Sequence, residues 1–106
     1  MFARNVLLQL KPNTLSKFVE GFEHDVLPRL QKHPGFRDVF ICASEDGTEV
    51  MATSLWDRQE EIDTYNATAY PEVLASLEEF LDGPPSVRSW KVIHATFHRS
   101  AVGIAA

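Results

Sequence analysis

The stretch FRDVFICASEDGTEVMATSLW, residues 36–56, decides the fold because it contains two strand-like runs separated by a tight turn. Residues 36–44 and 49–56 are rich in aromatic and β-branched residues, which favour strands. Between them, Glu45-Asp46-Gly47-Thr48 places a glycine where a hairpin turn requires positive φ. We therefore predict an antiparallel β-hairpin at the centre of the fold.

Towards the N-terminus, a strand and a long helix precede the hairpin. Residues 2–11, FARNVLLQLK, are rich in strand formers and end at Pro12, which cannot continue the backbone hydrogen bonds of a sheet. A helix is predicted from about residue 14 to residue 33, because apolar residues recur there at spacings of three and four. Pro28 lacks a backbone N–H, and we expect it to bend or tighten this helix.

Towards the C-terminus, two shorter helices and a last strand follow the hairpin. Asp57 begins the first helix, Pro71 suits the first turn of the second, and residues 87–98 alternate as a strand does. The order β-α-β-β-α-β predicts an α+β chain with a ferredoxin-like plait, in which a four-stranded antiparallel sheet carries its helices on one face. We assign residues 1–98 to this domain and residues 99–106 to a C-terminal tail.

The first strand carries large apolar side chains on both of its faces. Its even positions include Val6 and Leu8, and its odd positions include Leu7. One layer of helices covers only one face of a sheet, so the other face needs a different cover. We expect a homodimer in which two sheets pack face to face.

Composition limits the partners and the compartment. The chain has 106 residues, a formal net charge of −5 and one cysteine, Cys42. An acidic balance does not neutralise phosphates, so we expect no nucleic-acid partner. No apolar run is long enough to span a bilayer and the N-terminus lacks a signal-peptide pattern, so we expect no membrane partner. A single cysteine excludes an internal disulfide, and we expect a cytoplasmic protein.

Several local features together resemble a known family. They are the Pro34-Gly35-Phe36 turn, the junction in which Trp56 is followed by an acid and a helix, and Tyr65 at the end of that helix. With Asn5 in the first strand, they make residues 2–98 similar to the antibiotic biosynthesis monooxygenase family. The resemblance implies a dimeric α+β barrel. The resemblance defines the function less closely than the fold, because members of the family include cofactor-free oxygenases of polyphenolic anthrones, haem-degrading oxygenases and quinol oxygenases.

The resemblance implies two catalytic residues. Asn5 falls where members often hold a polar residue that points into the cleft between sheet and helices, and its amide could donate to a developing phenolate or peroxy oxygen. Its alternative role is a strand-start residue satisfied by its own backbone. Trp56 corresponds to a tryptophan that walls an aromatic substrate and donates one hydrogen bond, with packing as the alternative. Haem cleavage is disfavoured, because PEVLASLEEF lacks the histidine that the haem-degrading branch requires.

Four further residues are candidates because of their own chemistry. His94, in the last strand, could act as a catalytic base towards a phenol, since its ordinary pKa is near ~6.5, or it is a rim histidine. Tyr65 and Tyr70 lie around the junction of the two C-terminal helices, where their hydroxyls could bond a substrate oxygen. Phe22, on the apolar face of the first helix, is the third predicted substrate-binding residue. We expect no metal, because His94 and His98 lie about 13 Å apart on a strand.

The scattered glycines form no phosphate-binding loop, so we expect no nucleotide cofactor either. Together these features predict a cofactor-independent monooxygenase, in which a small, deprotonated aromatic or quinol substrate itself reduces O₂. The alternative is a non-catalytic protein that uses the same dimeric barrel to bind a small ligand or an interaction partner. Haem degradation is the weaker enzyme alternative.

Overall fold

The strands form one antiparallel sheet, in agreement with the predicted plait. The computed structural model of the chain describes residues 1–96. The strand order is β2-β3-β1-β4, and every neighbouring pair is antiparallel. The strands are β1 (Phe2–Gln9), β2 (Phe36–Ala43), β3 (Glu49–Trp56) and β4 (Ser86–Lys91). The central hairpin closes as predicted, with Gly47 at a φ of 74°.

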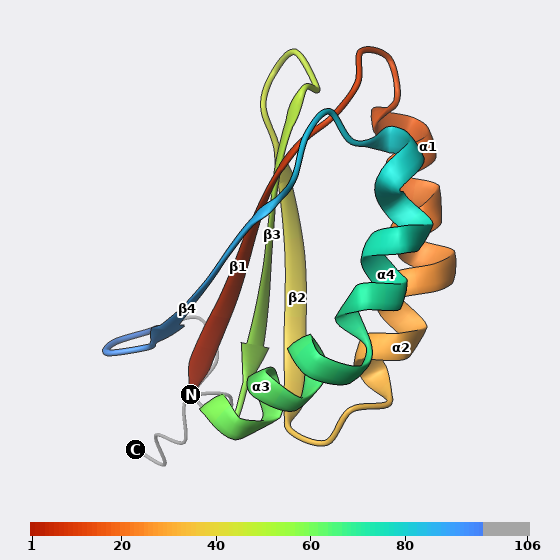
Figure 1. Ribbon diagram of the computed structural model, residues 1–106. Helices are drawn as coiled ribbons and strands as arrows, with labels where there is room; N and C mark the ends of the chain where they lie inside the picture. Colours follow the sequence, from red (N-terminus) through yellow and green to blue (C-terminus); the bar gives the residue numbers. More distant parts are fainter. Residues whose placement is uncertain (97–106) are drawn as a thin grey trace.

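The helices lie together on one face of the sheet (Figure 1). They are α1 (Leu15–Gly21), the π-helical turn η1 (Phe22–Val26), α2 (Leu27–Gln31), α3 (Gln59–Thr68), α4 (Tyr70–Leu77) and the short 3₁₀ turn η2 (Glu78–Phe80). The predicted element order and the single helical layer are confirmed. Among the described residues, no helix combines the length and the apolarity that crossing a membrane requires.

The π-helical turn η1 lies in the middle of the first helical segment. The N–H of Leu27 donates to the carbonyl of Phe22, five residues earlier, and the proline at position 28 follows directly. Since Pro28 has no N–H to donate, the regular hydrogen-bond ladder is interrupted there. We expected Pro28 to bend or tighten the helix, and the tightening is wrong, because a π-helical turn is wider than an α-helical one.

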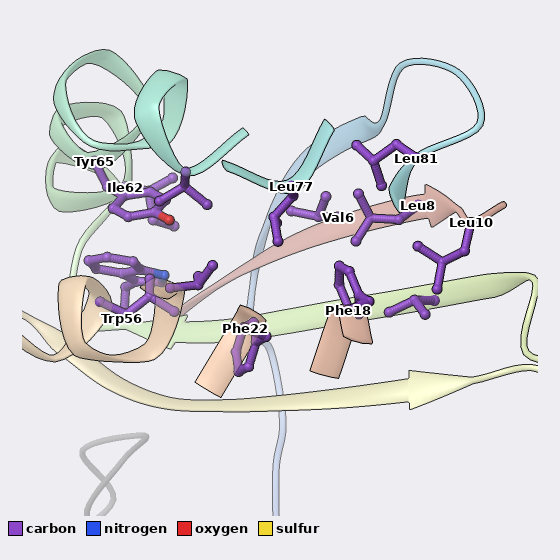
Figure 2. Close-up of a cluster of buried hydrophobic side chains, with 14 residues drawn as sticks. Val6, Leu8, Leu10, Phe18, Phe22, Trp56, Ile62, Tyr65, Leu77 and Leu81 are labelled. Atoms are coloured by element: carbon purple, nitrogen blue, oxygen red, sulfur yellow. The ribbon is translucent and has the colours of Figure 1, made fainter. Parts of the chain in front are cut away.

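The alternation along β1 decides which side chains face the helices. Val6, Leu8 and Leu10 are buried on the helix side, where β1 pairs with Val50 and Ala52 of β3. They join the aromatic residues of the helices in one core (Figure 2). Burying each large apolar side chain contributes roughly 1.5–3 kcal/mol, so this face of the sheet carries most of the stability.

The opposite face of the sheet, which we call the open face, is covered by no helix of residues 1–96. Leu7, Phe40 and Trp90 are 43%, 49% and 49% exposed on it. The expectation of large apolar residues on both faces of β1 is therefore confirmed. Cys42 of β2 also lies on this face and is exposed.

The last strand is shorter than predicted. We expected it to extend over residues 87–98, but β4 ends at Lys91. The N–H of Val92 still donates to the carbonyl of Met1, at the end of the neighbouring strand β1. His98 and the predicted tail lie outside the described residues.

Candidate functional site

A cavity lies between the helix-facing side of the sheet and the helices. It has a volume of about 50 Å³, and eleven of its fifteen lining residues are apolar. The four lining residues with polar side-chain atoms are Arg4, Ser54, Tyr65 and Tyr70. Space of this size holds a few water molecules, so a ligand with an aromatic ring requires the walls to move outward.

The polar residues gather at one end of the cavity. Arg4 of β1 and Ser54 of β3 are cross-strand neighbours. The Arg4 guanidinium carbon lies 4.9 Å from the ring centre of Tyr65 and 4.4 Å from that of Tyr70. The rest of the cavity is walled by aliphatic and phenylalanine side chains. One end of the cavity is therefore polar and positively charged, and the remainder is apolar.

Arg4 is an unusual residue for the inner face of a strand. It is only 4% exposed, and its Nε donates to Oδ1 of Asn66 at 2.7 Å. Both ion pairs of the described residues, Arg29–Glu72 and Arg37–Asp57, lie elsewhere. Buried charges are normally paired with an opposite charge. Arg4 has an amide oxygen and two aromatic faces in place of a carboxylate.

Two donors at this end are buried and have no hydrogen-bond partner within the described residues. They are Nη2 of Arg4 and the hydroxyl of Tyr70. Burial lowers the pKa of Arg4, while the neighbouring tyrosines oppose that change. Burial also raises the pKa of Tyr70, while the charge of Arg4 and the close approach of its side chain to the hydroxyl act in the opposite direction. Such unsatisfied groups are rare in folded proteins and call for a partner that binds there.

The junction between α3 and α4 positions both tyrosines. Tyr65 lies in the last turns of α3, and Tyr70 begins α4 directly before Pro71. Because Pro71 has no N–H and suits the first turn, α4 begins anew there and the helical path changes direction. Tyr65 is 1% exposed, and burial raises the pKa of its hydroxyl. The break in the helix thus places two phenol groups beside the same guanidinium.

Three predicted substrate-binding residues come together at the cavity. Phe22, Tyr65 and Tyr70 all line it, from η1, α3 and α4 respectively. Phe22 belongs to the apolar part, and the tyrosines belong to the polar end. Their function as substrate contacts remains a prediction, since the structure gives only their positions.

Trp56 lies on the helix side of the sheet as expected, but it is not among the residues lining the cavity. It is fully buried, and its ring centre is 5.5 Å from that of Tyr65 (Figure 2). Its indole N–H donates to Oγ of Ser54 at 2.9 Å. The indole N–H is therefore already used, and Trp56 supports the polar end through Ser54 and Tyr65.

Two predicted positions are corrected by the structure. Asn5, expected in the cleft between sheet and helices, lies on the open face, where its Nδ2 donates to Oγ1 of Thr53 at 2.9 Å. The alternation of β1 is the physical reason, because Arg4 and Val6 take the inner face. His94 is exposed in the segment after β4 and does not line the cavity. Neither side chain joins the residues gathered around Arg4.

Three residues of the polar end were not predicted from the sequence, namely Arg4, Ser54 and Asn66. A signal for Arg4 was present, because it shares the even positions of the first strand with apolar residues that are buried. A charged residue at a strand position that faces the core is exceptional and marks a candidate site. No comparable pattern points to Asn66, which reaches Arg4 only through the packing of α3 on the sheet.

The arrangement suits an organic molecule better than a metal ion. The polar end offers guanidinium and hydroxyl donors, whereas a metal requires several acceptor ligands. Within residues 1–96, no three His, Cys, Asp or Glu side chains are grouped closely enough to hold a metal. A flat apolar body fits the aliphatic and aromatic walls, and an oxygen of that body fits the donors.

The fold is similar to that of several solved structures. A monooxygenase from the ActVA-Orf6 gene of Streptomyces coelicolor, solved in complex with nanaomycin D, matches with a TM-score of 0.77 at 24% identity. The match covers 92% of this chain and 91% of that one. A protein from Nitrosomonas europaea, provisionally named an antibiotic biosynthesis monooxygenase, matches with a TM-score of 0.74 at 16% identity, over 89% of this chain and all of that one.

Rv0793 from Mycobacterium tuberculosis has a TM-score of 0.71 at 18% identity, over 89% of this chain and 96% of that one. No family model matches the sequence, and no curated protein matches it. At these identities the likeness establishes the fold. That fold is the one found in structures named as antibiotic biosynthesis monooxygenases, as the resemblance in the sequence implied.

Proposed function

We propose that the protein is a monooxygenase of the antibiotic biosynthesis type, which oxidises a small phenolic aromatic or quinol substrate without a cofactor. The observation that carries this proposal is the polar end of the cavity, where Arg4 and Tyr70 contribute buried donors without a partner among the described residues to the lining of an otherwise apolar space. The shared fold with structures named monooxygenases supports it.

The proposed reaction balances without an external reductant. A phenol with a ring C–H reacts with O₂ to give a quinone and water. One oxygen atom forms the new carbonyl and the other leaves as water with the two hydrogens lost from substrate carbon and hydroxyl. The substrate supplies all four electrons. The protein has to position the substrate, stabilise its oxygen and exclude water.

The residues around the cavity divide these tasks. The apolar walls, including Phe22 of η1, hold the ring, while Arg4 and Tyr70 donate to the substrate oxygen. Since the space is about 50 Å³, substrate entry requires the wall formed by η1 and α4 to move outward. The irregular hydrogen bonding of η1 makes that wall the easier one to displace.

Oxygenation of anthrone tests the proposal. Metal-stripped protein is mixed with anthrone in air, and O₂ uptake is compared with anthraquinone formation after the spontaneous reaction is subtracted. We expect one O₂ consumed per quinone formed and one labelled oxygen in the quinone when ¹⁸O₂ is used. The Arg4→Met variant should lose about a hundredfold in rate, whereas Arg58→Met, an exposed arginine at the start of α3, should keep its rate.

If neither anthrone nor a dihydroxynaphthalene is oxidised above the spontaneous rate, the oxygenase proposal is wrong. Binding of these compounds without turnover would then favour the non-catalytic ligand-binding alternative. A readout of binding therefore accompanies each turnover assay.

The proposal includes a homodimer formed through the open face. Leu7, Phe40 and Trp90 lie exposed on that face, and a second copy would cover them. Sedimentation should show a species of twice the 12.0 kDa chain mass at micromolar concentration. A monomer under those conditions would exclude this assembly. The exposed, unpaired Cys42 thiol suits a reducing compartment, so we place the protein in the cytoplasm.

A further inference from the structure

We propose that the cavity binds its ligand as an anion, with the negative oxygen accepting hydrogen bonds from both Nη2 of Arg4 and the hydroxyl of Tyr70. This inference rests on the proposed function and deepens it, because it makes the charge of Arg4, and not a separate base, the feature that selects the ionised form of the substrate. The shared ligand chemistry is a single negative oxygen group on a flat apolar ring.

The buried charge of Arg4 favours an anionic ligand. Arg4 is 4% exposed and no acidic residue lines the cavity beside it. A guanidinium remains protonated inside proteins, so its charge persists after burial. The amide oxygen of Asn66 and the faces of Tyr65 and Tyr70 compensate that charge only in part, since none of them carries a full negative charge. An anionic ligand completes the compensation.

Two buried donors that belong to neighbouring side chains lack an acceptor among the described residues. Nε of Arg4 is held by Asn66, which fixes the guanidinium and leaves Nη2 as the buried nitrogen without an acceptor. The Tyr70 hydroxyl is buried and without a partner as well, and its ring lies against the same guanidinium. Two fixed donors side by side bind one oxygen group more strongly than either could alone.

The rest of the cavity adds no further charged side chain from the described residues. Apart from Arg4, the ionisable residues within positions 1–96 that line it are Tyr65 from α3 and Tyr70 from α4. His33, from the turn after α2, lies against the outer side of Tyr65, with ring centres 5.2 Å apart. The lining residues of α1, η1, α2, β2 and β3 carry no ionisable group. Arg4 is thus the dominant charge acting on a bound ligand, and it favours the ionised form of a phenol.

This ionic form matters for the proposed chemistry. A phenolate or enolate gives up electrons to O₂ more readily than the neutral phenol. A site that lowers the pKa of the bound substrate therefore prepares it for reaction without a strong base. No histidine of residues 1–96 lines the cavity, so the role predicted for His94 passes in this scheme to the positive charge of Arg4.

The test uses 4-nitrophenol, whose phenolate absorbs visible light, so that both binding and ionisation are measured in one titration. With excess protein, we expect the apparent pKa of 4-nitrophenol to fall by about one unit or more. In Arg4→Met the shift should disappear and phenolate affinity should fall about tenfold or more. Tyr70→Phe, which removes only the unpartnered hydroxyl, should give a smaller loss of about threefold to tenfold.

Neutral ligands and a matched variant serve as controls. Binding of 4-nitroanisole, which cannot ionise, should be weaker than that of the phenolate and should be unchanged or stronger in Arg4→Met. Arg58→Met changes the net charge by the same amount at an exposed position and should bind 4-nitrophenol as the unmodified protein does. Should Arg4→Met fail to fold, Arg4→Lys retains the charge and should retain the direction of the shift, while Tyr70→Phe still tests the hydroxyl.

A second pair of probes distinguishes the source of the anion. Tight binding of benzoate over benzamide with no phenolate binding would support the anion site and contradict the phenolic substrate of the proposed function. Equal affinity for 4-nitrophenolate and 4-nitroanisole would overturn the anion site. So would an undiminished phenolate affinity in Arg4→Met, or a lack of binding of both 4-nitrophenolate and benzoate. All of these experiments measure binding. A failure of the anion site can therefore be distinguished from a lack of oxygenase turnover.

Discussion

Replacing Arg4 with methionine should separate stability from function. Methionine has a similar length and packs favourably against aromatic rings, so it can occupy the place beside Tyr65 and Tyr70. If Arg4 is present for ligand binding, the protein without ligand bears the cost of a buried, incompletely compensated charge. Removing that charge should then leave the free energy of unfolding nearly unchanged or raise it, while ligand affinity falls.

The expected magnitude follows from the contacts of Arg4. The variant loses one charged hydrogen bond to Asn66, worth about 1.5–3 kcal/mol, and the contacts of the cation with two rings, worth roughly 1–2 kcal/mol. Removing the guanidinium also removes its desolvation penalty of several kcal/mol, which stabilises the variant. Asn66 is only half-buried, so water can replace its lost partner. The opposing contributions nearly cancel, and we expect a change within about 1 kcal/mol, or a gain in stability.

Urea unfolding followed by far-UV circular dichroism measures this change, provided that the slope m stays constant between variants. Leu8→Ala is the matched packing control. Leu8 lies on the same face of β1, is 4% exposed, and should cost about 2–5 kcal/mol when truncated. A structural role for Arg4 predicts that Arg4→Met lowers the free energy of unfolding by about 3 kcal/mol or more, as when a buried charge network is broken. That result would refute our functional explanation of Arg4.

Three other changes give independent tests of the structure. Gly35→Ala should lower the free energy of unfolding by about 1–3 kcal/mol in urea titrations, because Gly35 has a φ of 83° and an added Cβ would overlap the carboxylate of Glu61. An unchanged urea midpoint would contradict that backbone conformation. Asp57→Asn should flatten the loss of stability in acid. The hydrogen bonds from Arg37 hold the pKa of Asp57 below its ordinary 3.8, so its stabilising contribution is complete above that value and disappears as the pH falls through the lower folded-state pKa. If the free energy of unfolding falls with pH in the same way in Asp57→Asn and in the unmodified protein, the Arg37–Asp57 pair does not contribute to stability. Asn5→Ala should cost about 1 kcal/mol through its lost hydrogen bond on the open face, and anthrone turnover per folded molecule should stay the same; a large loss of turnover would return this residue to the site.

Local patterns in the sequence determined the element order. The hairpin follows from Gly47, which adopts the positive φ that its turn requires, and from strand formers on both sides. The separate start of α4 follows from Pro71, which fits a first helical turn. These features depend on neighbouring residues alone. Together with the limited choice of βαββαβ topologies, they predicted the sheet and its single helical layer.

The site depended on tertiary structure. Both faces of β1 carry apolar side chains, so the pattern alone did not decide whether Arg4 or Asn5 points to the helices. The register with β3 decides it, since Arg4 pairs with Ser54 on the inner face and Asn5 with Thr53 on the open one. A shift by one residue would exchange the two faces. The contact of Arg4 with residues of α3 and α4 joins positions more than sixty apart in the chain, and such contacts form only when the helices dock.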